Sequence, residues 1–205
     1  MKKKQKIIMM IVIIFAITGT MVSVKEWRYK DEIQINSEHF PDEEFREYIL
    51  FAIDKDNNRR LSEEEIMQTT EIDISDTPTH SLQGIEYFTE LRNLSCYVIH
   101  IFDLDVSKNT KLEYLNCDDN QISKLDLTNN KKLKDLSCSW NMLTELDLAE
   151  NMELTELSCI GNQLTTLDLS QNIKLKKLEC SDNKLEQLIL PDKEDLEILS
   201  EDESE

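Results

Sequence analysis

The chain has 205 residues, a length that suits one domain with short appendages. Its 23 Lys and Arg residues against 42 Asp and Glu residues give a formal net charge of −19. That balance disfavours nucleic acid as a partner, because phosphate binding requires a basic face. Aromatic residues make up only 6% of the chain, so the core is expected to consist mainly of Leu and Ile.

The first 24 residues differ in composition from the rest of the chain. An uncharged run of 18 residues extends from Ile7 to Val24. The basic residues that precede it are Lys2, Lys3, Lys4 and Lys6. This arrangement predicts either a secretory signal peptide or a single membrane anchor over residues 1–24, and the sequence leaves both open. In both cases the remainder is predicted to be extracytoplasmic, either secreted or anchored to the cell membrane by the N-terminal segment.

Residues 33–76 are predicted to form a helical cap. Apolar residues at helical spacing predict an amphipathic helix over residues 42–53. Ser62 and Glu65 then have the spacing of a capping box, which marks the start of a second helix. Residues 72–76 read as half of a coil, so the cap is expected to pack on the first coil and shield its open apolar edge.

The loop between these helices, residues 54–65, resembles an EF-hand calcium-binding loop. Oxygen donors occupy loop positions 1, 3, 5, 9 and 12, and Leu61 supplies the apolar residue at position 8. Arg59 stands at position 6 in place of the usual Gly, where a positive φ costs a larger residue on the order of 1 kcal/mol. The sequence therefore leaves two interpretations: a calcium site, or a structural cap with no metal or other cofactor. The candidate calcium ligands are Asp54, Asp56, Asn58, Arg60, Ser62 and Glu65.

The strongest regularity in the chain is the spacing of its five cysteines, which follow one another every 21 residues at Cys96, Cys117, Cys138, Cys159 and Cys180. Aligning the chain on them gives the repeat L-x-x-L-x-C-x-x-N-x-L-x-x-L-D-L-x-x-N-x-x. Alternating apolar residues in L-x-C and L-x-L predict two short extended segments per repeat, each apolar on one side. Stacked repeats would bury these sides against one another, and the recurrent Asn residues would satisfy backbone groups at the bends.

This pattern resembles the leucine-rich repeats, specifically the short bacterial class of 21-residue repeats called IRREKO, over residues 90–190. Residues 81–91 resemble the first coil of internalin-like surface proteins. The resemblance implies an α/β solenoid: short parallel β-strands form a curved stack, the convex side is mostly extended or turn structure, and a helical cap precedes the repeats. We expect the solenoid to occupy residues 77–194, with five repeats from residue 90, and an acidic tail to occupy residues 195–205.

Two columns of side chains recur through the repeats. The cysteines take inward positions where other repeats carry Leu, so buried and unreactive thiols are expected. Disulfides between coils would require distortion, because in-register side chains point the same way, and a straight column does not gather four zinc ligands at one point. An outward column consists of Asp105, Asp126, Asp147 and Asp168. These carboxylates are expected to stabilise turns, with a cation-binding ladder as the alternative.

The best candidate for a binding surface is the solvent side of the L-x-x-L-x-C strands. Its outward positions vary between repeats while the scaffold positions do not, as a recognition surface requires. Aromatic and apolar side chains there would anchor a partner, and acidic neighbours would favour a basic one. For Trp140 and Ile160 the alternative is simple packing beside a turn. The candidate ligand-binding residues are Tyr97, Tyr114, Asp118, Ser137, Trp140, Ser158 and Ile160.

The sequence carries no motif of the common enzyme classes, and its three histidines show no partner pattern, so the chain is not expected to be an enzyme. The internalin-like resemblance implies an exported cell-surface or secreted protein. It would bind another protein or a host-surface ligand through its concave face, as a monomer. The alternative is a structural spacer or a shortened paralogue of a larger surface protein, anchored in the membrane and without a ligand of its own.

Overall fold

The structure, a computed structural model, describes residues 32–199 of the chain. The candidate signal or anchor segment at residues 1–24 lies outside the described residues, and so does the end of the chain from residue 200. Within the described part, none of the helices combines the length and the apolar character of a membrane span.

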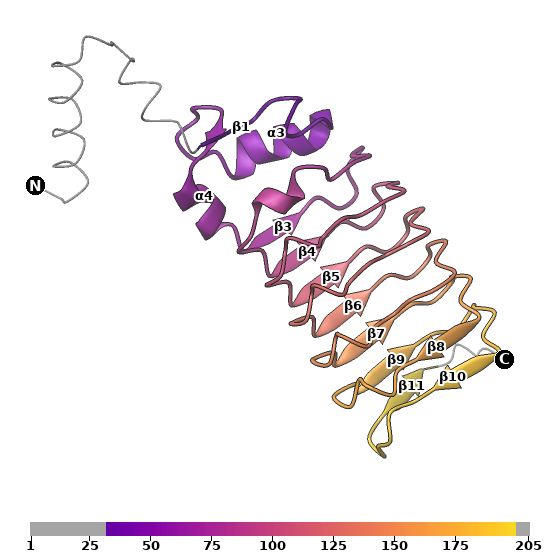
Figure 1. Cartoon of the computed structure of the whole chain (residues 1–205). Helices are drawn as coiled ribbons and strands as arrows, with labels where there is room; N and C mark the ends of the chain where they lie inside the picture. Colours follow the sequence, from indigo (N-terminus) through magenta and orange to yellow (C-terminus); the bar gives the residue numbers. More distant parts are fainter. Residues whose placement is uncertain (1–31, 200–205) are drawn as a thin grey trace, which may run out of the picture. The chain divides into compact units, whose positions relative to one another are not determined.

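The N-terminal cap contains two helices and a small antiparallel sheet (Figure 1). Its elements are β1 (Ile33–Gln34), α3 (Glu43–Ala52), β2 (Arg60–Leu61) and α4 (Glu63–Gln68). Helix α3 begins where the sequence predicts it, because the Asp42 side chain accepts a hydrogen bond from the Phe45 amide at 2.9 Å. Helix α4 begins with the predicted capping box between Ser62 and Glu65.

Aromatic side chains join the cap to the first coil. The Phe40 ring is fully buried and meets the Phe45 ring edge-on, with ring centroids 6.1 Å apart. It also contacts Phe88 of the first coil, at a centroid distance of 6.5 Å. Gly84 has a φ of 106°, and a side chain there would overlap the Phe40 ring. The cap therefore covers the apolar N-terminal end of the stack.

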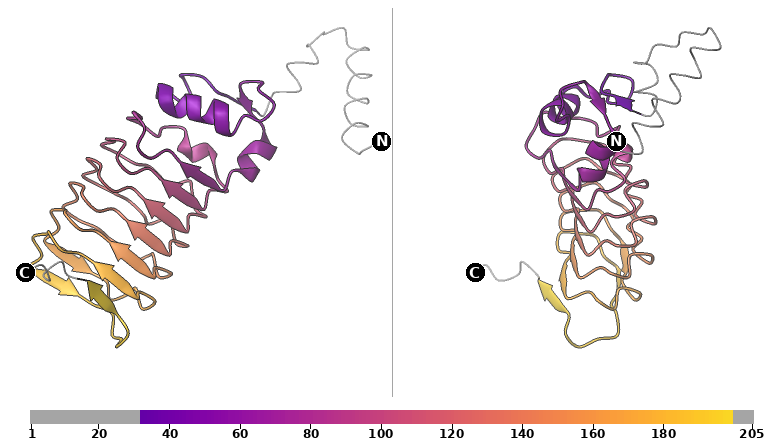
Figure 2. Two further views of the ribbon diagram at one scale, coloured as in Figure 1. Left: turned by 180° about the vertical axis from the view of Figure 1, so that it is seen from behind. Right: turned by 90° about the vertical axis from the view of Figure 1, so that its left-hand side faces the viewer.

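Seven short strands form one parallel sheet along the stack, in the spatial order β11-β9-β7-β6-β5-β4-β3 (Figures 1 and 2). Each strand contributes three residues, and equivalent residues of successive repeats pair, so that Leu94 lies beside Leu115 and Leu115 beside Leu136. The strands are β3 (Glu71–Asp73), β4 (Asn93–Ser95), β5 (Tyr114–Asn116), β6 (Asp135–Ser137), β7 (Glu156–Ser158), β9 (Lys177–Glu179) and β11 (Glu197–Leu199).

The opposite side of the coils has little regular structure. A 3₁₀ turn spans Ile85–Tyr87 in the first coil. Only the second halves of the last two repeats form strands, β8 (Thr166–Asp168) and β10 (Gln187–Ile189), which pair in parallel. Across the rest of that side the L-D-L segments run without strand pairing among the described residues. The predicted fold class, a leucine-rich-repeat stack with parallel strands on one side and mostly extended or turn structure on the other, is confirmed.

The end of the repeats differs from the expectation. Residues 195–205 were expected to form an acidic tail, yet residues 197–199 form β11 and pair with β9. The reason is that Ile198 takes the place beside Leu178 that a repeat Leu would take, although the segment is rich in acidic residues. The apolar pattern therefore continues by one strand beyond the expected boundary.

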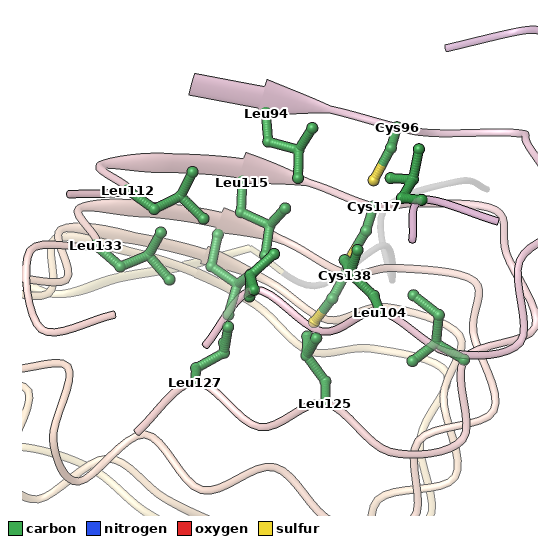
Figure 3. Packing of buried hydrophobic residues seen from close by; sticks show 14 of the residues in the cluster. Leu94, Cys96, Leu104, Leu112, Leu115, Cys117, Leu125, Leu127, Leu133 and Cys138 are labelled. Atoms are coloured by element: carbon green, nitrogen blue, oxygen red, sulfur yellow. The ribbon is translucent and has the colours of Figure 1, made fainter. Parts of the chain in front are cut away.

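Leucines and cysteines from both sides of each coil fill the interior (Figure 3). Leu94 and Leu115 project from the strands toward Leu125 and Leu127 on the opposite side. The first four cysteines are fully buried and the fifth is partly exposed, and all five are free thiols in the structure. Burial raises the pKa of the Cys159 thiol to about 12, so this sulfur stays protonated and unreactive at neutral pH.

Candidate functional site

We call the solvent side of the seven-stranded sheet, together with the residue that follows each cysteine, the sheet face. Its side chains form three columns that run across the coils. The first column contains Glu71, Asn93, Tyr114, Asp135, Glu156, Lys177 and Glu197. The second contains Asp73, Ser95, Asn116, Ser137, Ser158, Glu179 and Leu199. The third contains Tyr97, Asp118, Ser139, Ile160 and Ser181.

A chain of hydrogen bonds crosses the sheet face and links three of the predicted site residues. The Ser137 hydroxyl donates to Asp118 at 2.7 Å. The Ser139 hydroxyl lies 2.8 Å from the Ser158 hydroxyl, which donates to Glu179 at 2.9 Å. Asp118, Ser137 and Ser158 are therefore brought together, but their polar atoms bind one another across coils and give this surface a fixed shape.

Asp118, a member of this chain of hydrogen bonds, is partly buried. Its carboxylate also accepts from the Ser139 amide at 2.6 Å. Burial raises the pKa of the Asp118 carboxyl above its ordinary value, the charges of Asp119 and Glu179 act in the same direction, and the hydrogen bonds oppose them. The hydrogen bonds from Ser137 and Ser139 fix the position of this carboxylate, which is largely shielded from water.

Two carboxylates face each other in the first column without a cation between them. Asp135 and Glu156 pair in register on adjacent strands, and burial followed by the charge of Glu156 raises the pKa of the Asp135 carboxyl. Like charges in such positions destabilise a sheet. Lys177 follows in the column, but its ammonium pairs with Glu179 at 2.9 Å. Tyr114 lies on the other side of Asp135.

The turns after the cysteines place Trp140 at the edge of the sheet face. The second residue after each cysteine is in the left-handed region, with φ of 54° at Trp140 and 64° at Gly161. The indole lies against Gly161 of the next coil, where a Cβ atom would overlap it. Half of the Trp140 surface, 50%, stays exposed. Trp140 therefore packs beside a turn, as the alternative interpretation has it, and still presents a large apolar surface.

The other predicted residues of this edge are partly exposed. Ile160 donates its amide to the Ser139 hydroxyl at 3.2 Å and accepts from the Trp140 amide at 2.7 Å. Tyr97 lies in the same column as Ile160, three coils earlier. The neighbouring carboxylate of Asp76 raises the pKa of the Tyr97 phenol. Together these residues form a partly apolar rim along one side of the sheet face.

Among the exposed apolar residues that were not singled out in the sequence, Met142 and Phe102 belong to the repeats and replace polar residues. Met142 is 46% exposed and lies two residues after Trp140. Phe102 is 64% exposed on the first repeat. A signal existed for both, because the equivalent positions of other repeats carry polar residues such as Gln121 and Gln163 for Met142, and Ser123 for Phe102.

The EF-hand-like loop of the cap brings three carboxylates together. One oxygen each of Asp54, Asp56 and Glu65 lies within 4.8 Å of the others. Arg59 adopts the left-handed conformation that the loop requires, with φ of 59°, and its amide donates to Asp54 at 2.9 Å. The Asn58 side-chain oxygen is buried and has no hydrogen-bond partner. The backbone at loop position 6 is thus left-handed without a Gly there.

The same carboxylate oxygens also accept hydrogen bonds from the loop itself. Glu65 accepts from the Lys55 amide at 2.8 Å and from the Ser62 hydroxyl at 2.7 Å. Asp54 and Asp56 each accept from the Asn58 amide at 3.1 Å. Both interpretations drawn from the sequence therefore have a structural basis: a calcium site and a self-sufficient cap.

The outward aspartates stabilise turns. Each accepts a hydrogen bond from the backbone amide two residues later: Asp105 from Ser107, Asp126 from Thr128, Asp147 from Ala149 and Asp168 from Ser170, at 2.9–3.0 Å. Hydrogen bonds from the hydroxyl and the amide of the same residue, Ser107, Thr128 or Ser170, lower the pKa of the Asp105, Asp126 and Asp168 carboxyls. The expected turn role of this column is confirmed.

No protein-family model matches the chain. Over 94 residues, 46% of its length, the chain is 36% identical to Internalin J of Listeria monocytogenes serotype 4b (strain F2365), and it spans 10% of that protein. It is similar to the functional domain of InlJ from Listeria monocytogenes, a structure that includes a cysteine ladder (TM-score 0.69, 28% identity, 83% of this chain and 47% of that one). It is also similar to the internalin InlF from strain 4b F2365 (TM-score 0.70, 26% identity, 75% and 47%).

Proposed function

Because the chain is an internalin-like leucine-rich-repeat protein, we propose that it is exported and binds a protein partner through the sheet face and its rim. The observation that supports this most is the indole of Trp140, half of whose surface is exposed, next to Ile160. The inward positions of the scaffold hardly change from repeat to repeat. Interfaces take most of their binding energy from such aromatic anchors. The likeness to the internalins also supports the expectation that the chain is not an enzyme.

The charge pattern of the sheet face favours a basic partner. Asp135 and Glu156 repel each other in register. The ammonium of Lys177, next to Glu156 in the column, offsets this only in part because it is paired with Glu179. A guanidinium from the partner would relieve that repulsion and stack on the neighbouring Tyr114 ring. Because these charges are near the surface, binding should weaken as salt concentration rises.

Proximity crosslinking on intact cells tests the surface assignment. The full chain with Trp140→Ala or Tyr114→Ala is expected to lose capture of the partner that the wild type crosslinks, since both changes remove an anchor. Phe102→Ala is the control, because Phe102 is an aromatic residue more exposed than Trp140, 64% against 50%, and it lies outside the sheet face and its rim. Equal capture by all four proteins, with unchanged circular dichroism, would refute this use of the sheet face.

The cap, the stack of repeats and the N-terminal segment are each assigned a role. We infer that residues 33–70 act as a cap and that the N-terminal segment directs export. The stack begins with β3 (Glu71–Asp73), ahead of the expected boundary at residue 77, because β3 pairs with β4. Cell fractionation of the same samples distinguishes release from membrane attachment. Membrane retention together with no crosslinked partner would favour the alternative, a spacer without a ligand.

We also propose calcium binding at the EF-hand-like loop as a second function, because the buried oxygen of Asn58 lacks a partner at the position where such a loop supplies a ligand. Calorimetric titration of the full chain with CaCl₂ should show binding. Glu65→Gln should abolish it without unfolding the cap, since Gln also completes a capping box. No heat at millimolar calcium would remove this proposal and leave the structural cap.

A further inference from the structure

Four asparagines form a buried column inside the solenoid, at the turn that ends each repeat. All four are fully buried. Each side-chain amide nitrogen donates to two backbone carbonyls of the preceding coil, as Asn151 does to Leu127 at 3.1 Å and to Asn130 at 3.0 Å. The column consists of Asn109, Asn130, Asn151 and Asn172.

The side-chain oxygen of every member of this column is buried and has no hydrogen-bond partner. Exchanging the oxygen and nitrogen positions does not solve this, because the nitrogen already points at two carbonyl oxygens in each case. An acceptor that loses water on folding and gains no donor is costly, and native proteins usually supply an ordered water in such places.

The other asparagine column shows what full pairing looks like in this fold. Asn141 donates to Cys117, Cys138 and Ser139, and its oxygen accepts from the Ile122 amide at 3.0 Å. The equivalent oxygens of its column accept in the same way: Asn120 from Ile101, Asn162 from Leu143 and Asn183 from Leu164. Of the two asparagine columns of the solenoid, only this one therefore has side-chain oxygens without a partner.

The repeat of the stack matches the reach of a water molecule. Strand spacing places equivalent atoms of adjacent coils ~4.8 Å apart. A water that donates both protons through bonds of ~2.8 Å joins acceptors ~4.5 Å apart. We propose that a single file of internal waters runs along this column, each donating one proton to the side-chain oxygen of each flanking asparagine. Four asparagines leave three gaps, so three waters complete the file.

This arrangement satisfies every orphan oxygen. The inner oxygens, on Asn130 and Asn151, each accept two protons, and the outer ones each accept one. A carbonyl oxygen has two lone pairs and accommodates both. The waters would be a fixed part of the scaffold, because coils above and below enclose them.

Oxygen-17 magnetic relaxation dispersion counts long-lived internal waters and tests the proposal on the full chain. Asn151→Leu should lower the count by two, because it removes a partner from two neighbouring waters. Asn141→Leu is the matched control: it removes a buried asparagine, 8% exposed, from the paired column and should leave the count unchanged.

A crystal structure of the wild-type chain provides a readout that does not depend on the stability of either variant. It should show density for one water between each pair of consecutive side-chain oxygens from Asn109 to Asn172. Empty density there, or an equal loss of long-lived waters in both variants, would overturn the proposal.

Discussion

At the scale of single residues, the turn after each cysteine decides what the sheet face presents. Five equivalent residues from Val98 to Asp182 adopt the left-handed conformation, although only one of them, Gly161, is a glycine. The stack favours this conformation, because the first four of these turns are each tied to the next coil by a backbone hydrogen bond, such as that from Trp140 to Ile160 at 2.7 Å. Trp140 is thereby aimed along the stack, over Gly161.

Gly161→Ala tests this contact. The new methyl group would overlap the indole and the left-handed backbone would be strained, so a loss of about 1–3 kcal/mol in the free energy of unfolding is expected. Urea denaturation measures it. In a Trp140→Ala background the same change should cost less, because only the backbone strain remains; an equal cost in both backgrounds would contradict the contact.

Asp118→Asn tests the electrostatics of the hydrogen-bonded chain. The pKa of Asp118 is raised in the folded state, so the unfolded chain loses this proton at lower pH than the folded protein does. The wild-type protein therefore loses stability as pH rises from the ordinary carboxyl pKa of ~3.9 to the raised pKa. Asparagine does not ionise. The stability of the variant relative to the wild type should therefore increase with pH across that window and level off above it. Urea denaturation at several pH values measures this, and a trend of opposite sign would show that the serine bonds dominate.

At the scale of elements, the cap completes the stack by filling its open end. Helix α3 and the segment before it contribute the rings of Phe45 and Phe40, and the first coil contributes Phe88. Further bonds tie the two together: the Asp73 amide donates to the Tyr48 hydroxyl at 3.3 Å, and the His80 amide donates to Asp42 at 2.9 Å. The cap is thus packed as part of the solenoid core.

Phe40→Ala should therefore destabilise the whole solenoid and not the cap alone. Removing a fully buried ring is expected to cost about 3–5 kcal/mol. Thermal unfolding followed by circular dichroism measures the loss. Phe51→Ala is the control on the same cap: its ring is 92% exposed, and its removal should have little effect. A separate early transition for the cap, with the solenoid unchanged, would contradict this account.

At the scale of the whole molecule, the repeat period predicted most of the fold. The Leu and Cys columns fix which side chains point inward, so the strands and the exposed columns followed from the alignment on the cysteines. Strand β11 lay inside the expected acidic tail, because the segment around Ile198 departs from the repeat motif and is followed by acidic residues. The contact between Trp140 and Gly161 was not predictable from the strand period, because it depends on a left-handed turn that the L-x-C pattern does not encode.

The same limit applies to the candidate sites. The sequence identified Asp118, Ser137 and Ser158 as outward, but not that they bind one another, because such bonds join residues about one repeat apart. It identified the ligand positions of the cap loop, while the orphan oxygen of Asn58 emerged only from the packing.

The affinity of the crosslinked partner for the full chain is the most direct test of the central claim. Tyr114→Ala, Trp140→Ala and the double change Asp135→Asn with Glu156→Gln should each weaken binding by about tenfold or more, as loss of an interface anchor typically does. Phe102→Ala should bind as the wild type does, and higher salt should weaken wild-type binding. Unchanged affinity in the three sheet-face variants would contradict recognition through this face.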